Sequence, residues 1–145
     1  MSSYLWVALG SALGGLARYA LTKWTLPWSE AMPWGTVLIN VFGCFLIGFF
    51  GTYTLASGKH ATAESMRLFV MVGICGGFTT FSSFSLQTFD LLREGAWGRA
   101  LLNVLLSVTL CFVAVGLGHL TAQTAVSRIA IAQTDTEEGM EPTST

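Results

Sequence analysis

Long uncharged stretches dominate the pattern of hydrophobic and polar positions along this chain. Residues 31–58, 68–89 and 100–127 contain no Asp, Glu, Lys or Arg. Each stretch reaches the roughly 20 residues that a helix needs to cross a bilayer. A further segment near the N-terminus is apolar except for Arg18. We therefore predict four transmembrane helices, at about 4–22, 34–56, 66–92 and 100–122.

The composition agrees with this pattern. The chain is 52% hydrophobic and 10% charged, whereas roughly 25% of the residues in a soluble domain are charged. No Lys or Arg precedes the first apolar segment and no small-residue cleavage site is apparent, so we do not read it as a signal peptide. The fold class that we predict is all-α integral membrane.

The composition changes after Arg128. The last residues are rich in Thr and Ser and carry four acids but no base, namely Asp135, Glu137, Glu138 and Glu141. Acidic segments with few apolar residues are typically disordered. We expect a four-helix transmembrane domain over 1–128 and a disordered acidic tail over 129–145. A solvated terminus explains this tail more simply than a regulatory arm does.

The basic residues are nearly balanced between the two sides of the membrane. With alternating helices, one side holds Lys59, Arg67 and Arg128, and the other holds Arg18, Lys23, Arg93 and Arg99. An excess of Lys and Arg normally fixes the orientation, so this balance favours insertion both ways up and an antiparallel homodimer. On charge alone, a single orientation is an equal alternative. It would follow if Arg18 lies too deep in the membrane to influence orientation, or if the small difference in basic residues between the two sides is enough to fix it.

Catalytic and metal-binding groups are scarce in the sequence. Cys44, Cys75 and Cys111 lie in predicted spans without a short-spaced pair, so we read them as small packing residues. His60 and His119 lie in a loop and near a helix end, so a transition-metal site is not expected. There is no phosphate-binding loop and no Gly-x-Ser-x-Gly elbow. We do not expect an enzyme.

The third span contains a polar segment in its middle. Residues 73–85 read Gly-Ile-Cys-Gly-Gly-Phe-Thr-Thr-Phe-Ser-Ser-Phe-Ser. Burying a hydroxyl or amide without a partner costs roughly 2–7 kcal/mol. These hydroxyls, together with Asn40, Asn103 and Ser107 in other spans, must therefore bond to one another or to a permeant species. Hydrogen bonds between helices are the simpler alternative, but the cluster as a whole favours a functional site.

A helix break at residues 76–77 would place two helix ends inside the bilayer. Carbonyls at the end of the first half suit a cation, and amides at the start of the second half, capped by Thr79 or Thr80, suit an anion. Phe81 and Phe84 are three residues apart and share one helix face. Because ring edges are positive and no acid lies beside them, the segment favours an anion path.

Three motifs in this chain resemble the Fluc/CrcB fluoride channels. They are GGLARY at 14–19, GTVLIN at 35–40 with Gly43, and GICGGFTTFSSF at 73–84. The third motif is long and unusual, which makes the resemblance specific, and the resemblance covers nearly all of residues 4–122.

The resemblance implies a passive, fluoride-selective channel that lowers cytoplasmic fluoride. It implies a multi-pass protein of the inner membrane, an antiparallel homodimer with two pores and a central structural Na⁺, and no nucleic-acid partner. Backbone carbonyls of Gly76 and Thr79 would hold the Na⁺, while Arg18 would draw in anions or brace the fold. The residues that would line the fluoride pathway are Phe81, Phe84, Asn40, Thr36, Thr80, Ser83, Ser107 and Gln87.

Two positions depart from the family pattern, and two other functions remain as alternatives. Gln87 stands where many members have an acid, and Cys111 stands where a serine is common. A proton-coupled exporter of cationic drugs would need a carboxylate in the first span, and residues 4–22 contain none. A structural subunit of a membrane assembly would leave the hydroxyl and phenylalanine cluster without a role.

Overall fold

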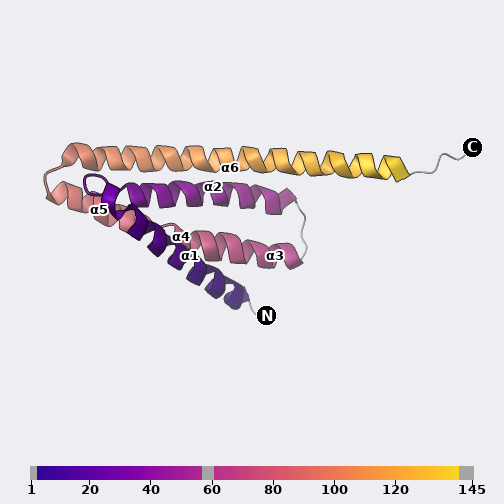
Figure 1. Cartoon of the computed structure of the whole chain (residues 1–145), viewed down its shortest axis with the longest axis horizontal. Helices are drawn as coiled ribbons and strands as arrows, with labels where there is room; N and C mark the ends of the chain where they lie inside the picture. Colours follow the sequence, from indigo (N-terminus) through magenta and orange to yellow (C-terminus); the bar gives the residue numbers. More distant parts are fainter. Residues whose placement is uncertain (1–2, 57–60, 141–145) are drawn as a thin grey trace, which may run out of the picture.

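The computed structural model describes residues 3–56 and 61–140, and every regular element in those ranges is helical (Figure 1). Successive long segments alternate in direction, so the turn between α1 and α2 and the turn between α5 and α6 lie at the same end of the bundle (Figure 1). The elements are α1 (Ser3–Thr25), η1 (Leu26–Trp28), α2 (Trp34–Ala56), α3 (Ala61–Arg67), the π-helix η2 (Leu68–Cys75), α4 (Gly76–Phe78), α5 (Phe81–Arg93) and α6 (Trp97–Met140).

Three helical segments of the described residues are long and apolar enough to cross a membrane, by length and composition. They are Trp34–Leu55, Glu64–Arg93 and Trp97–Ile129, which confirms three of the predicted spans. The fourth span corresponds to α1, a helix of 23 residues. This helix also carries Arg18 and Lys23 and is not among the three, so its passage through the membrane stays a prediction.

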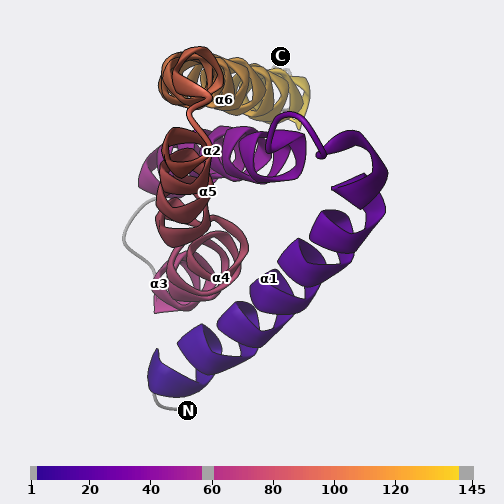
Figure 2. The same ribbon diagram turned by 90° about the vertical axis from the view of Figure 1, so that its left-hand side faces the viewer.

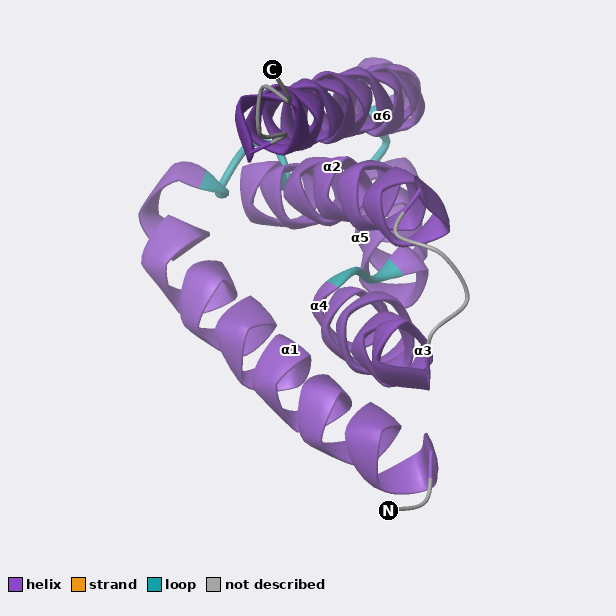
Figure 3. Cartoon of the chain, turned by 90° about the vertical axis from the view of Figure 1, so that its right-hand side faces the viewer, coloured by secondary structure: helices purple, strands orange, loops and turns teal. Residues whose placement is uncertain are grey.

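The third span is broken, but not at the predicted glycines. Gly76 and Gly77 are helical in α4, and the chain becomes extended at Thr79 and Thr80, with ψ angles of 156° and 107° (Figure 3). Gly77 serves close packing instead, because a Cβ there would lie 2.6 Å from the carbonyl oxygen of Ser11 on α1. The predicted break at residues 76–77 was therefore wrong by about one helical turn.

Glycines bring the helices into backbone contact. α1 crosses η2 and α4 (Figure 2), and a side chain at Gly10 or Gly14 would collide with backbone atoms of those elements. Likewise, α2 and α6 lie side by side along most of α2, and Gly48 and Gly118 face backbone atoms across this contact. The pocket described below lies between these elements.

The expectation of a disordered tail was wrong for residues 129–140. α6 continues as one helix to Met140. Residues 129–133 are Ile-Ala-Ile-Ala-Gln, which continue the helix without a breaker, and the first proline after Arg128, Pro142, comes after the end of the helix. At 1.5 Å per residue the 44-residue helix is about 66 Å long. Residues 141–145 of the predicted tail lie outside the described residues.

Candidate functional site

Asn40 on α2 is hydrogen-bonded to the backbone at the break. Its Oδ1 accepts a hydrogen bond from the Thr80 amide at 2.7 Å, and its Nδ2 donates to the Thr80 carbonyl at 3.1 Å. In a continuous helix the Thr80 amide would donate to the carbonyl of Gly76, so Asn40 replaces that acceptor. A side-chain amide has two N–H groups, and one of them remains for another partner.

Thr80 caps α5, which confirms one of the two caps predicted from sequence. Its Oγ1 accepts from the Ser83 amide at 3.1 Å, and its hydroxyl donates to Ser83 Oγ at 3.0 Å. The positive end of the α5 dipole lies at this cap. The first turn of α5 therefore offers a partial positive charge without any basic side chain.

The end of the first half-helix has a different character. The amide and the hydroxyl of Thr79 both donate to the carbonyl of Cys75, at 2.9 and 2.8 Å. The carbonyls of Gly76 and Thr79 lose their usual helical donors, since the amides of Thr80 and Ser83 have other acceptors. Backbone oxygens freed in this way are the kind of ligand that hard cations take.

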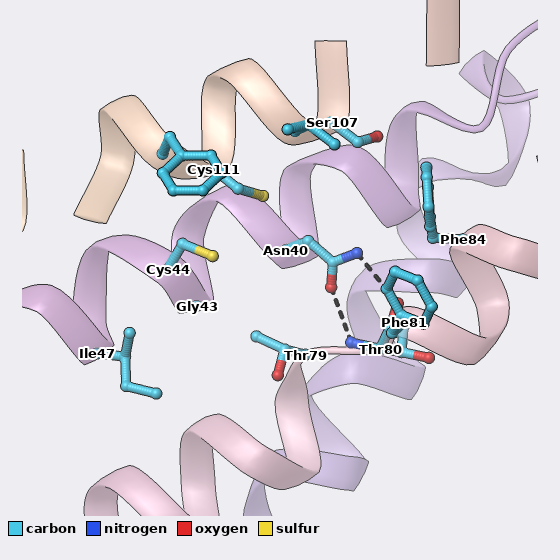
Figure 4. A pocket seen from close by; sticks show the side chains of 12 residues that line it. Asn40, Gly43, Cys44, Ile47, Thr79, Thr80, Phe81, Phe84, Ser107 and Cys111 are labelled. Atoms are coloured by element: carbon cyan, nitrogen blue, oxygen red, sulfur yellow. Dashed lines mark hydrogen bonds between the residues drawn. The ribbon is translucent and has the colours of Figure 1, made fainter. Parts of the chain in front are cut away.

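A pocket of about 350 Å³ opens between α2, the break, α5 and α6 (Figure 4). Amide and hydroxyl groups line one part of it, and thiols and apolar side chains line another. No Asp, Glu, Lys or Arg is among its lining residues. These are Asn40, Gly43, Cys44, Ile47, Thr79, Thr80, Phe81, Phe84, Ser107, Val108, Cys111 and Phe112.

Phe81 and Phe84 form a ring pair at the pocket, as their spacing predicted. Their centroids are 5.5 Å apart and the ring planes are tilted by 47°. Phe84 is buried, whereas Phe81 is 79% exposed. One ring thus belongs to the interior wall, and the other lies on the surface of the single chain.

A second polar network supports the α6 side of the pocket. Ser107 donates to Asn103 Oδ1 at 3.4 Å, and Asn103 Nδ2 donates to the hydroxyl of Thr88 at 2.8 Å. Both Asn103 and Ser107 are buried. Their bonds fix the position of Ser107 relative to α5, so the hydroxyl is held in the wall.

The structure brings together some of the predicted pathway residues but not all. Asn40, Thr80, Phe81, Phe84 and Ser107 line the same pocket, and Ser83 bonds to Thr80. Of the other predicted site residues, Thr79 also lines the pocket, whereas the rest do not, namely Thr36, Ser83, Gln87, Arg18 and Gly76.

Three of these residues have distinct settings. Thr36 is buried one turn before Asn40 on α2. The Oε1 atom of Gln87 is buried and has no hydrogen-bond partner among the described residues. Gly76 is exposed beside the break.

Sequence reasoning did not place Cys44 at the pocket, and it singled out Cys111 only as a departure from the family pattern. Cys44 and Cys111 line it, whereas Cys75 is buried outside its lining. Helical spacing could have placed both cysteines at the pocket, because Cys44 follows Asn40 by four residues and Cys111 follows Ser107 by four. Each cysteine therefore shares a helix face with a residue that had been assigned to the pathway.

Comparison with known proteins adds an independent finding. Residues 5–119 match the family described as CrcB-like protein, Camphor Resistance (CrcB). The chain is 60% identical over 134 residues to the fluoride-specific ion channel FluC of Gluconobacter oxydans, covering 91% of this chain and 93% of that protein. It is 60% identical over 116 residues to FluC of Methylobacterium radiotolerans, covering 80% and 81%. All pocket residues fall within the family match.

Proposed function

This chain belongs to the CrcB family of multi-pass cell-membrane proteins, and we propose that it is a fluoride-specific ion channel that conducts passively. The similar proteins named above carry that function in their names. The observation that supports it most is the helix break at Thr79 and Thr80, which Asn40 holds open beside an uncharged pocket. Conduction through this pocket would lower cytoplasmic fluoride.

The donors at the pocket suit a small, strongly hydrated anion. Fluoride needs hydrogen-bond donors to replace its water, but a fixed Lys or Arg would hold it too tightly to pass. The second N–H of Asn40 and the positive ring edges of Phe81 and Phe84 are such weak donors. The hydroxyls of Thr80 and Ser107 would join them by turning away from Ser83 Oγ and Asn103 Oδ1. A drug exporter is less well supported, because α1 contains no acidic residue.

Other predicted pathway residues would act beyond the pocket. Thr36 and Ser83 continue the polar groups next to Asn40 and Thr80, and Gln87 would donate to the anion through its Nε2. Arg18 on α1 would attract anions at the approach or brace the fold.

We propose that the working unit is an antiparallel homodimer with two pores. Phe81 is 79% exposed in the single chain although its ring pairs with Phe84 at the pocket. A second copy would cover this ring and complete the wall of the pathway. The near-balanced basic residues at the two ends of the bundle are consistent with insertion in both orientations.

A structural Na⁺ at the centre of the dimer fits the free carbonyls at the break. The carbonyl oxygens of Gly76 and Thr79 lack their helical donors, and Na⁺, as a hard cation, prefers oxygen ligands. These residues from both subunits would hold the ion. When bound, it would supply positive charge that links the two broken helices.

Fluoride efflux from liposomes tests the proposal. Purified dimer should release fluoride rapidly and chloride not at all, and both Phe81→Ile and Asn40→Asp should abolish the release. Phe89→Ile is the matched control, because Phe89 lies on the same helix, is 58% exposed and does not line the pocket. Absence of fluoride release from folded, dimeric wild-type protein would overturn the proposed function.

A further inference from the structure

Two thiols from different helices line the wall of the pocket. Cys44 lies on α2 and Cys111 on α6, and both are free. Both line the same pocket, and Figure 4 shows both sulfur atoms turned toward the space between the two helices. The anion pathway proposed above requires neither thiol.

The thiol pair lies one helical turn from the polar part of the pocket. Cys44 follows Asn40 by four residues on α2, and Cys111 follows Ser107 by four on α6. At 1.5 Å per residue, each cysteine lies about 6 Å along its helix from the polar residue. Anything bound between the thiols would therefore narrow the space in which Asn40 and Ser107 face the pocket.

The number of ligands restricts which ion would bind. Zinc normally takes four protein ligands in structural sites or three in catalytic ones. Among the residues that the structure describes, no three His, Cys, Asp or Glu side chains converge. Two thiols alone suit soft ions that accept two sulfur ligands in line, because thiolates select soft metals.

We propose that Cys44 and Cys111 form a two-thiol site for a soft, thiophilic ion such as Hg²⁺, and that an ion bound there closes the pocket. With HgCl₂, two Hg–S bonds form, and two chlorides and two protons leave. The product is neutral, so it leaves no uncompensated charge in the apolar wall. The closing of the pocket, but not the binding, rests on the proposed channel function.

Binding is tested on the full-length protein in detergent with HgCl₂ alone. Native mass spectrometry should show one mercury per chain that survives washing with excess monothiol, and the sulfur-to-mercury charge-transfer absorption should appear. Cys75→Ala should retain both signals, whereas Cys44→Ser and Cys111→Ser should each lose the monothiol-resistant mercury. Resistant mercury in Cys44→Ser or Cys111→Ser, or its loss in Cys75→Ala, would overturn the site.

The effect on transport is measured as fluoride efflux relative to the untreated sample of the same variant. HgCl₂ should abolish most of the efflux of the wild type and of Cys75→Ala, and a dithiol should restore it. The Cys44→Ser, Cys111→Ser double variant should keep its efflux, and block of that variant would refute closure at this site. A wild-type protein that carried no fluoride would refute the channel, while the mercury count would still decide the binding site.

Discussion

The side-chain amide of Asn40 forms hydrogen bonds with both the backbone N–H and the backbone carbonyl of Thr80. These groups lie where the helix ladder is interrupted, so no neighbouring turn replaces the lost partner. A buried backbone group left without a hydrogen bond costs about 1–3 kcal/mol. Asn40 is therefore expected to stabilise the break as well as to donate to an ion.

We predict that Asn40→Ala lowers the free energy of unfolding by about 2–4 kcal/mol, because two backbone groups lose their partner. Reversible unfolding in detergent micelles measures this change. The control is Thr54→Val, since the Thr54 hydroxyl bonds only to carbonyls of its own helix, and its effect should stay within about 0.5 kcal/mol. Equal effects of the two variants would contradict the role of Asn40 at the break.

The hydroxyl of Thr80 caps the first turn of α5. Thr80→Val removes the oxygen that accepts from the Ser83 amide and should cost about 1 kcal/mol, as the loss of other N-caps does. Ser85→Ala on the same helix should cost less, because the exposed Ser85 hydroxyl bonds back to Phe81. Thermal unfolding of both variants measures the difference, and a Ser85→Ala variant as unstable as Thr80→Val would count against the cap.

Single residues could be predicted from sequence where their neighbours in the chain suffice. The Thr80 cap and the pairing of Phe81 with Phe84 depend on residues three positions apart, and both are confirmed. The bond between Asn40 and Thr80 joins residues 40 positions apart, and Cys44 and Cys111 line one pocket from two different helices. Such pairs depend on how the helices pack, which no local pattern determines.

The contact of α1 with the broken third span depends on which glycines face it. An added Cβ at Gly14 would collide with the backbone of Ile74, whereas an added Cβ at Gly15 would meet nothing within 4 Å. These adjacent positions have the same residue and the same helical backbone. They therefore separate the requirement for close packing from the helix propensity of glycine.

We predict that Gly14→Ala destabilises the protein by about 1–3 kcal/mol, the usual range for overpacking. Gly15→Ala should be neutral or stabilise by about 0.5–1 kcal/mol, because alanine is the better helix former. Equilibrium unfolding of the two variants in one detergent provides the comparison. If Gly15→Ala were the more damaging, α1 would not pack on η2 and α4 as described.

The elements themselves could be predicted with mixed success. The uncharged stretches predicted both ends of α2 correctly, because a helix that crosses the bilayer needs a minimum length of apolar residues. The break was placed too early, since paired glycines signal either a bend or a close contact, and here they serve contact. The end of α6 was placed too early because acidic composition does not by itself terminate a helix.

At the scale of the whole molecule, the basic residues at the two ends predict insertion in both orientations. Adding positive charge at one end should fix the orientation, because Lys and Arg excess determines which side faces the cytoplasm. Gln123 and Thr124 are exposed near one end of the bundle, on α6. Substitution there changes charge without touching the pocket.

We predict that Gln123→Lys and Thr124→Lys, combined with Lys23→Gln and Arg93→Gln, make a C-terminal tag accessible from one side of the membrane only, because five basic residues then lie at one end and two at the other. The wild-type tag should be accessible from both sides. Fluoride efflux from cells should fall, because antiparallel pairs can no longer form. Gln123→Glu with Thr124→Glu is the matched control, since acids contribute little to orientation. A wild-type tag confined to one side would refute the antiparallel dimer.

Simultaneous fluoride and chloride efflux from liposomes that contain the wild-type protein, followed with two ion-selective electrodes, tests whether the chain is a fluoride-specific channel. An uncharged pocket beside a capped helix break should pass fluoride quickly and hold chloride back. Fluoride release without chloride release is the predicted result. Equal release of the two anions, or release of neither from folded protein, would contradict a fluoride-specific channel.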